Sequence, residues 1–279
     1  MAFSYSITLS SFSNLEDIEK TLEKLSSIGF TQLEMFGEPD GINYRSIKDA
    51  FSSYNFKVIG ITGMWGKISP LGWKRRILSN DVSFRKYSER YLLKCIDMCS
   101  YFGGNKINVC LISDPIYSFD LTHRSISKES KKNILTKSFP MLNFLINKAN
   151  EYGINLLLEP LNRYSTPFCS NLNDALFVVE SCENLKIMLD TFHMNIEEDS
   201  FENTIIKSKN FLYHLHFADN NRKMPGLGHI NFDGIISALK NISYSDTISY
   251  EPTINNLNYK EDLIFGKKFI EEMESKYFS

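Results

Sequence analysis

Short apolar runs alternate with longer amphipathic segments along the whole chain, and this alternation restricts the fold more than any other feature of the sequence. The short runs are rich in β-branched, aromatic or leucine residues, and the longer segments repeat apolar residues at helical spacing. The expected strands cover 4–10, 31–37, 56–63, 106–113, 154–160, 185–192, 211–219 and 246–252. The expected helices cover 14–29, 44–55, 83–103, a segment ending at 153, 171–183, 200–210, 231–241 and 259–275.

The apolar strands favour a closed barrel of parallel strands. Runs such as "LLL" at 156–158 and "IML" at 187–189 are typical of strands that are buried on both faces. Eight strand–helix units in 279 residues fit a (β/α)8 barrel with right-handed crossovers. A doubly wound open sheet is the competing fold, but the first turn, "TLSSFS", lacks the GxGxxG pattern. We therefore predict one (β/α)8 domain over residues 1–279.

The composition limits which partners the protein is expected to bind and indicates the compartment in which it is expected to work. A net charge of −2 gives no general attraction to nucleic acid or to anionic membrane surfaces. Five cysteines without a CxxC motif predict reduced thiols and a cytoplasmic location. The N-terminal stretch lacks the features of a signal peptide, and no run of 18 apolar residues predicts a membrane span.

Ionisable residues stand at the ends of four consecutive expected strands. In a (β/α)8 barrel the active site lies at the carboxyl ends of the strands, which are roughly 4.8 Å apart. Three carboxylates this close repel one another unless a cation is present, and an oxygen-rich set with one imidazole suits Mn²⁺, Mg²⁺ or Co²⁺. Each residue alone has a plainer interpretation as a helix cap or core histidine, but four in succession favour a metal site. They are Glu159, Asp190, His216 and Glu251.

Four motifs in the second half resemble one enzyme group. They are "LEPLNRY" at 158–164, "MLDTFHMNIEED" at 188–199, "HLHFADNNRKMPGLG" at 214–228 and "SYEP" at 249–252. They are similar to motifs of the ketose 3-epimerases, the D-tagatose and D-allulose (psicose) 3-epimerase group. These enzymes belong to the sugar isomerase/epimerase superfamily, which has a xylose isomerase-like TIM barrel. The resemblance is dense over about residues 150–255, and elsewhere it rests on the order of strands and helices and on the "GMWG" loop.

The resemblance implies an activity and a role for each site residue. It implies that the chain inverts C3 of a ketose through a cis-enediolate stabilised by one divalent ion, with Mn²⁺ the first candidate and Co²⁺ or Mg²⁺ the others. Glu159, Asp190, His216 and Glu251 would bind the ion. Glu159 and Glu251 would also act as the acid/base pair. His193 and Arg222 would hold substrate oxygens. In the same motif, we interpret Glu197 and Glu198 as a solvated face or as helix-start charges.

Two further residues are candidates for contact with the sugar. Trp65, in the loop after the third expected strand, is a candidate wall of the sugar pocket, with core packing as its plain alternative. Ser165 stands where the ketose epimerases carry a glutamate that touches substrate hydroxyls. A serine is shorter and uncharged, so this departure concerns the identity of the substrate and leaves the predicted ion ligands unchanged.

Other functions of the same superfamily remain open. An aldose–ketose isomerase of the hydroxypyruvate isomerase type, or an inosose dehydratase-like lyase, would use the same ion and related proton chemistry. DNA repair by an AP endonuclease relative is excluded. It needs further histidines after the third and fourth strands, and "TGMWG" and "CLISDP" contain none. A barrel that only binds sugar is disfavoured because both acid/base glutamates are present. The expected partner is therefore a small sugar, and the family is compatible with a homodimer or homotetramer.

Overall fold

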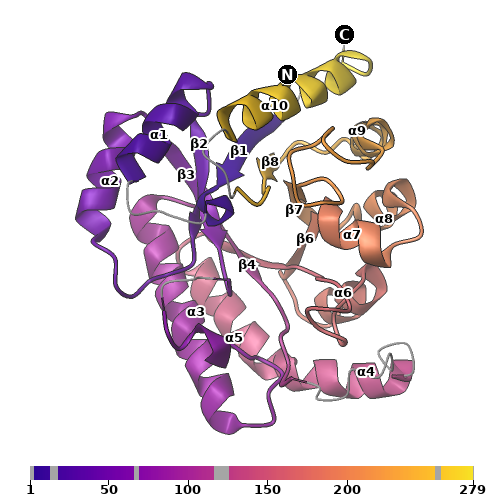
Figure 1. Ribbon diagram of the computed structural model, residues 1–279. Helices are drawn as coiled ribbons and strands as arrows, with labels where there is room; N and C mark the ends of the chain where they lie inside the picture. The colour runs from indigo at the N-terminus through magenta and orange to yellow at the C-terminus, as the bar shows by residue number, and fades with distance from the viewer. Residues whose placement is uncertain (1–2, 13–17, 66–68, 116–125, 255–258, 279) are drawn as a thin grey trace.

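The computed structural model describes residues 3–12, 18–65, 69–115, 126–254 and 259–278. Eight parallel strands close into a barrel in chain order, and β1 pairs with β8 to complete the ring. Figure 1 shows the helices arranged around this ring. The (β/α)8 prediction is therefore confirmed. The strands are β1 Ser4–Thr8, β2 Gln32–Phe36, β3 Lys57–Thr62, β4 Lys106–Val109, β5 Asn155–Leu158, β6 Lys186–Asp190, β7 Leu212–Phe217 and β8 Thr247–Tyr250.

The strands form because their side chains are buried on both faces, as the continuous apolar runs predict. All four residues of β4 are buried, and so are the last three of β5. Two places break the regular register: Leu33 of β2 pairs with Val58 but Glu34 pairs with Gly60, and a similar shift separates Ile187 from Met188 between β6 and β7. Such bulges redirect side chains near functional sites.

Most helices begin at a polar cap. Asp81 accepts a hydrogen bond from the Ser83 N–H at the start of α3, and Asn171 accepts one from the Asp174 N–H at the start of α6. The helices are α1 Ile18–Ser27, α2 Tyr44–Ser53, α3 Val82–Phe102, α4 Lys128–Leu135, α5 Phe139–Asn150, α6 Leu172–Val179, α7 Thr191–Glu197, α8 Phe201–Ser208, α9 Phe232–Asn241 and α10 Tyr259–Ser275. Short 3₁₀ turns occupy Leu9–Ser11, Gly72–Lys74 and Thr136–Ser138.

Several expected boundaries are wrong: the fourth expected strand, 106–113, ends at Val109, and the first, 4–10, ends at Thr8. The sequence predicts a strand over 185–192, but β6 ends at Asp190 and the next residues form α7. The Asp190 side chain causes this change, because its Oδ1 accepts a hydrogen bond from the Phe192 N–H at 2.7 Å and caps the new helix. The predicted helical residues 14–17 lie outside the described residues, so the first helix is described from Ile18.

The amino end of the barrel is closed by packing between the two ends of the chain. Glu274 of α10 is buried and accepts hydrogen bonds from the Phe3 N–H at 3.2 Å and from the Tyr5 hydroxyl at 2.9 Å. Tyr5 also stacks on Tyr250, with ring centroids 5.3 Å apart. In Figure 1, α10 accordingly lies across β1, near both chain ends.

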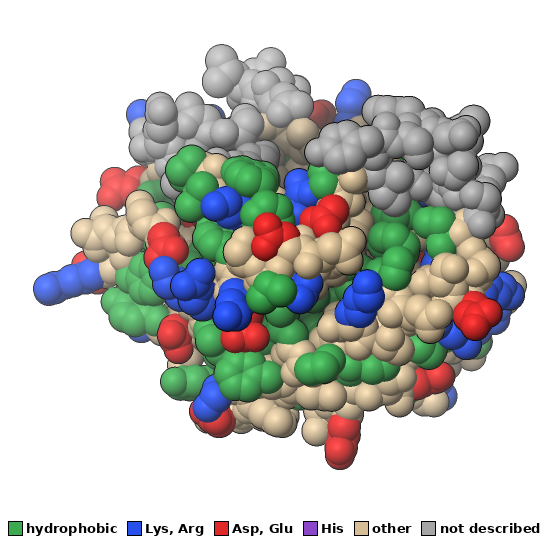
Figure 2. Space-filling model, turned by 90° about the horizontal axis from the view of Figure 1, so that it is seen from below, with side chains coloured by type: hydrophobic (Ala, Val, Ile, Leu, Met, Phe, Trp, Pro, Cys, Tyr) green, Lys and Arg blue, Asp and Glu red, His purple; other side chains and the backbone are tan. Residues whose placement is uncertain are grey.

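The surface and the thiols agree with the composition. Seen from below, one face carries basic and acidic side chains interspersed with apolar ones (Figure 2). All five cysteines lie in the described part of the chain, and each is buried and unpaired. No helix among the described residues combines the length and the apolar character that crossing a bilayer requires.

Candidate metal centre and active site

Asp190, Arg222 and Glu251 form the charged centre of the site. Asp190 ends β6, Glu251 follows β8, and Arg222 reaches both from the loop between β7 and α9. Its Nη1 lies 2.5 Å from Asp190 Oδ2, and its Nη2 donates to Glu251 Oε2. Burial acts to raise the pKa of Asp190, but Arg222 and two neighbouring histidines hold that pKa below its usual value. The site therefore keeps Asp190 ionised.

The loop that presents Arg222 is held by one buried acid, Asp219. Its carboxylate accepts hydrogen bonds from the N–H groups of Gly226 at 2.9 Å and Ile230 at 3.1 Å. Arg222 has a left-handed backbone with φ of +60°, and its carbonyl accepts a hydrogen bond from the Thr253 N–H at 2.7 Å. These contacts hold the unfavourable backbone conformation that turns Arg222 towards the site.

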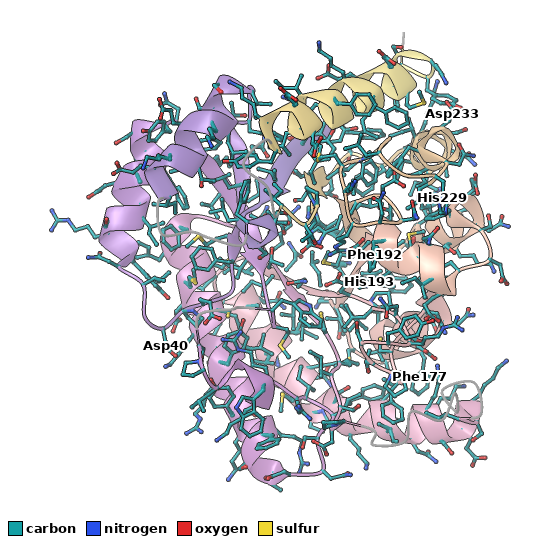
Figure 3. All side chains as sticks on the ribbon, in the orientation of Figure 1. Asp40, Phe177, Phe192, His193, His229 and Asp233 are labelled. Carbon is teal, nitrogen blue, oxygen red and sulfur yellow. The ribbon has the colours of Figure 1, made fainter. Side chains whose placement is uncertain are left out.

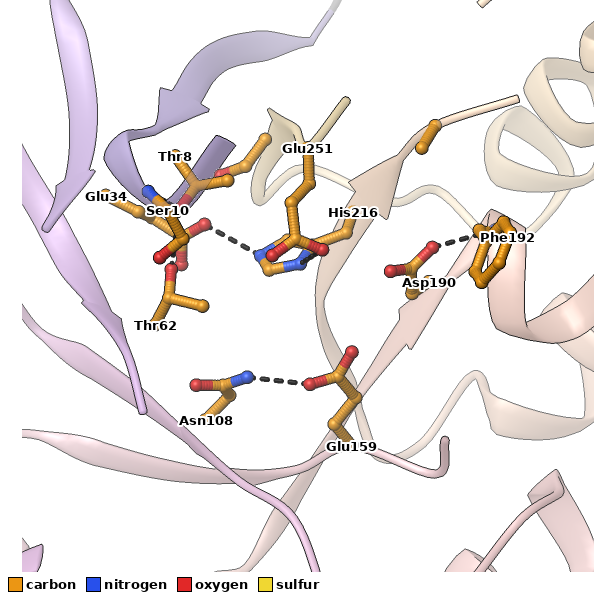
Figure 4. A network of polar contacts seen from close by, with 12 residues as sticks. Thr8, Ser10, Glu34, Thr62, Asn108, Glu159, Asp190, Phe192, His216 and Glu251 are labelled. Carbon is orange, nitrogen blue, oxygen red and sulfur yellow. Dashed lines mark hydrogen bonds and ion pairs between the residues drawn. The ribbon is translucent and has the colours of Figure 1, made fainter. Parts of the chain in front are cut away.

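His216 in β7 lies between two carboxylates, one that follows the neighbouring strand β8 and one from β2. Its Nδ1 is 3.0 Å from Glu251 Oε2, and its Nε2 is 2.7 Å from Glu34 Oε2. Figure 4 shows Glu34 to the left of the His216 ring and Glu251 reaching the ring from above. Burial acts to lower the pKa of His216, but the two carboxylates outweigh it and raise the pKa well above its usual value.

Glu159 follows β5, and two side chains of the neighbouring strand hold it. Asn108 Nδ2 donates to Glu159 Oε2 at 2.7 Å (Figure 4), and the Cys110 thiol lies 3.4 Å from the same oxygen. Asn108 Oδ1 in turn accepts a hydrogen bond from the Gly63 N–H, which fixes the orientation of the amide. Burial, together with the nearby Glu251 and Asp190, raises the pKa of Glu159 to about 7.

His193 points into the site from the first turn of α7, and its tautomer follows from its partners. Asn162 Oδ1 accepts a hydrogen bond from the Tyr164 N–H, so Asn162 Nδ2 donates to His193 Nδ1 at 2.7 Å. The ring proton of a neutral His193 is then on Nε2, which lies 3.9 Å from both Glu159 Oε1 and Asp190 Oδ2. Burial lowers the pKa of His193 and so favours this neutral form. Figure 3 places His193 inside the ring of helices.

The donor atoms fit a divalent ion. Ligand atoms of Asp190, His216 and Glu251 lie within 4.8 Å of one another, and the same is true of Glu159, Asp190 and His193. Both groups are buried and oxygen-rich, as Mn²⁺, Mg²⁺ and Co²⁺ prefer, but Nε2 of His193 carries its proton, so the second group offers the oxygens of Glu159 and Asp190 as ligands. Arg222 contacts two of these carboxylates, so it supplies part of the positive charge that three buried acids need.

The two residues predicted to contact the sugar lie at the rim. Trp65 is 42% exposed, which rules out the core packing weighed for it, and its side chain hydrogen-bonds to Cys110. Because Cys110 contacts Glu159, Trp65 lies beside the site. Ser165 is exposed in the turn after β5, where its N–H donates to the Asn162 carbonyl.

The interpretation of Glu197 and Glu198 as a solvated face is wrong, whereas Glu198 does accept a hydrogen bond at the start of a helix, α6. The Glu197 side chain is 6% exposed and forms an ion pair with Arg163, with Nε to Oε1 at 2.8 Å. Glu198 accepts hydrogen bonds from the Leu172 N–H at 2.7 Å and from the Thr204 hydroxyl at 3.1 Å. The two acids fasten the segment after β6 to the loops beside it.

Several site residues have no counterpart in the sequence prediction. Asn108, Cys110 and Asn162 contact predicted site residues directly, and so does Glu34, which is not among the predicted site residues. A polar asparagine inside the apolar run "KINVCLIS" is the one sequence signal that pointed to Asn108.

A cavity of about 910 Å³ lies elsewhere, between α4 and α6, and none of the eight predicted site residues lines it.

Comparison with known proteins agrees with the geometry. The model of the xylose isomerase-like TIM barrel family matches residues 22–269. The D-psicose 3-epimerase of Ruminiclostridium cellulolyticum is 30% identical over 247 residues, which are 85% of this chain and 79% of that protein. That of Agrobacterium fabrum is 38% identical over 115 residues, which are 40% of each chain.

A solved structure agrees with the fold. The D-psicose 3-epimerase of Clostridium cellulolyticum with D-tagatose superposes with a TM-score of 0.78 over 97% of this chain and 99% of that one, at 22% identity. At this identity the likeness supports the barrel alone. The family itself is shown by the match of the family model and by the relative that is 30% identical over most of both chains. The chain therefore belongs to the xylose isomerase-like TIM barrel family, and within that family to the ketose 3-epimerase group.

Proposed function

We propose that the chain is a divalent-metal-dependent epimerase that inverts C3 of a ketose. The observation that supports this most directly is the order of the site residues: Glu159 and Glu251 come from β5 and the end of β8, and Asp190 and His216 come from the two strands between them. Inversion next to a ketone requires a proton to leave one face and another to arrive on the opposite face. Two carboxylates on either side of the substrate serve as base and acid.

The hydrogen bonds of the two glutamates suit this exchange of roles. Among the described residues, Glu159 is held through Oε2 by Asn108 and Cys110, and Glu251 is held through Oε2 by His216 and Arg222. None of these four partners donates a hydrogen bond to the Oε1 atom of either glutamate. Each glutamate is thus oriented by one oxygen and has the other available for a substrate proton.

In this proposal one set of residues holds the ion and another set contacts the substrate. Glu159, Asp190, His216 and Glu251 hold the ion, which as a Lewis acid supplies positive charge that makes the C–H bond more acidic. Mn²⁺ is our first candidate, with Co²⁺ or Mg²⁺ as the others, because the donors are mainly carboxylate oxygens. His193 and Arg222 are donors for substrate oxygens, and Arg222 stabilises the negative charge that develops there.

We also propose a cytoplasmic location and a homodimer or homotetramer. The first rests on the five buried, unpaired cysteines, which a reducing compartment keeps as thiols. The second rests on the family alone, and the mass of the protein measured by light scattering tests it. Trp65 and Ser165 complete the proposal as residues that contact the part of the sugar farthest from the ion.

Hydrogen exchange measured by NMR tests the reaction. The Mn²⁺-loaded protein is incubated in D₂O with allulose, fructose, tagatose or ribulose, and a protein kept with a chelator is the control. We expect deuterium at C3 together with the C3-inverted ketose in the loaded sample only. Deuterium at C1 or C2 with an aldose product would contradict the proposal and identify an aldose–ketose isomerase, and loss of water would identify a lyase.

Ser165 gives this experiment a second use. If no free ketose exchanges, the substrate carries a further group, and the missing glutamate at this position marks where that group lies. Ser165→Glu restores the side chain found in the ketose epimerases. Gain of exchange on a free ketose in this variant would then link the substrate preference to this position.

A further inference from the structure

Glu34 is a buried acid that approaches the site from a strand in the first half of the chain. It lies in β2, it is 2% exposed, and its partner His216 is 182 residues further along the chain. The register of β2 against β3 shifts beside Glu34, and the register of β6 against β7 shifts before His216, next to His214. Such shifts change the direction of side chains.

The two nitrogens of His216 have different surroundings. Nδ1 lies 3.0 Å from Glu251 Oε2, in the group formed with Asp190, whereas Nε2 lies 2.7 Å from Glu34 Oε2. An imidazole that binds a metal through one nitrogen keeps its proton on the other and needs an acceptor for it. Glu34 Oε2, at 2.7 Å from Nε2, is such an acceptor.

His214 lies beside the other oxygen of the Glu34 carboxylate. Its Nδ1 donates to the Thr247 carbonyl at 2.7 Å, and its Nε2 lies 3.0 Å from the Ser249 hydroxyl and 3.4 Å from Glu34 Oε1. Its ring packs edge-on against His216, with centroids 5.3 Å apart. The Ser249 hydroxyl is itself hydrogen-bonded to Ser6 at 2.5 Å. A closed set of buried contacts thus holds Glu34 against His216.

The same three side chains, Glu34, His214 and His216, also have ligand atoms within 4.8 Å of one another. A second ion here would have to displace the proton that His216 Nε2 shares with Glu34, while His214 Nδ1 is already occupied by a carbonyl. His216 Nε2 and His214 Nδ1 already form hydrogen bonds without an ion, and we favour this arrangement.

We infer that Glu34 is a positioning residue, which accepts the Nε2–H of His216 and so directs Nδ1 of that ring towards the metal centre. This inference rests on the proposed function, because it assigns Glu34 a role in binding the same ion. It reaches beyond the four predicted ligands to a strand in the first half of the chain.

Metal titration of purified, metal-free protein tests the inference. We would measure Mn²⁺ affinity and stoichiometry by calorimetry, and the visible absorption of bound Co²⁺, which reports the ligand geometry. The variants are Glu34→Ala and Glu34→Gln. Glu274→Gln is the matched control, since Glu274 is equally buried but lies at the amino end of the barrel.

We expect one ion per wild-type chain and, in Glu34→Ala, an affinity lower by about 10- to 100-fold with an altered Co²⁺ spectrum. Glu34→Gln should lose less than about tenfold, because its amide oxygen still accepts the Nε2–H. Glu274→Gln should match the wild type. If Glu34→Ala does not fold, Glu34→Asp replaces it, and withdrawal of the carboxylate should weaken binding more than the glutamine does.

Three results would overturn the inference. They are wild-type affinity and spectrum in Glu34→Ala, an equal loss in Glu274→Gln, or two ions per wild-type chain of which the Glu34 variants lose one. The last would show a second ion in place of a positioning contact. A wild-type protein that binds no divalent ion would remove the proposed metal centre itself, and that result is distinct from the other three.

Discussion

Strands β5 to β8 end in the ionisable side chains of the proposed chemistry, whereas β1 to β4 contribute side chains that hold those groups in place. Glu159, Asp190, His216 and Glu251 all belong to the second half. From the first half, Glu34 contacts His216 and Asn108 contacts Glu159. Figure 4 shows these contacts crossing the interior of the barrel.

The difference follows from the geometry of a closed barrel. Inward-facing side chains of all eight strands fill one narrow interior, so residues far apart in sequence touch there. The second half can then present carboxylates to an ion and a sugar while the first half orients them. Thr8 and Thr62, whose hydroxyls lie 2.8 Å apart, are a further buried polar pair of the first half.

The largest effect should come from the second half, in Glu251→Gln. Loss of one acid/base group costs roughly 10²–10⁴-fold in rate, and loss of an ion ligand adds to this, so we expect turnover at least about 1,000-fold below wild type. The fold should persist, since the barrel strands do not depend on this side chain. Hydrogen exchange followed by NMR measures the turnover, and circular dichroism measures the fold. Turnover near the wild-type rate in Glu251→Gln would exclude the assigned role.

A smaller effect should appear in the stability of the metal-free protein, in Glu159→Gln. Burial raises the pKa of Glu159 to about 7 from 4.5, so the folded state binds its proton more tightly than the unfolded state. This stabilisation is complete below pH 4.5 and is lost as the pH rises through about 7. The variant has no such dependence. Its free energy of unfolding relative to wild type should therefore increase by about 3 kcal/mol between pH 5 and pH 8.

Urea unfolding with a chelator present measures this difference. A difference between the variant and the wild type that does not change with pH would mean that Glu159 is not the buried acid described here. Added Mn²⁺ gives a second measurement on the wild type, because ion binding requires the ionised carboxylate. The ion should raise the unfolding midpoint more at pH 8 than at pH 5.

The sequence predicts the second half of the site better than the first for a physical reason. Glu159 and Asp190 each end an apolar run, and a charged residue at that place is visible without knowledge of the fold. The contact between Glu34 and His216 depends instead on closure of the barrel, which leaves no periodic pattern in the sequence. The strands themselves were predictable because burial on both faces requires continuous apolar runs.

Errors in the prediction also have local causes. Asp190 caps a helix that the apolar pattern had assigned to a strand, because a side-chain hydrogen bond outweighs the preference of two residues. Glu197 was expected in solvent, but Arg163 lies 34 residues before it in the chain and its pairing cannot be inferred from local sequence. The first correction is a local helix cap, whereas the second depends on a contact formed only after the elements assemble.

The smallest effect should come from the first half, in Asn108→Ala. This change removes the donor that orients Glu159 and leaves the ion ligands intact, so we expect kcat to fall about tenfold with little change in KM. Thr62→Val is the control, because it removes a buried hydrogen bond of the first half that does not involve Glu159. A loss in Asn108→Ala as large as that in Glu251→Gln would mean that the first half of the barrel contributes to the chemistry directly. Equal losses in Asn108→Ala and Thr62→Val would mean that the first half contributes only general packing.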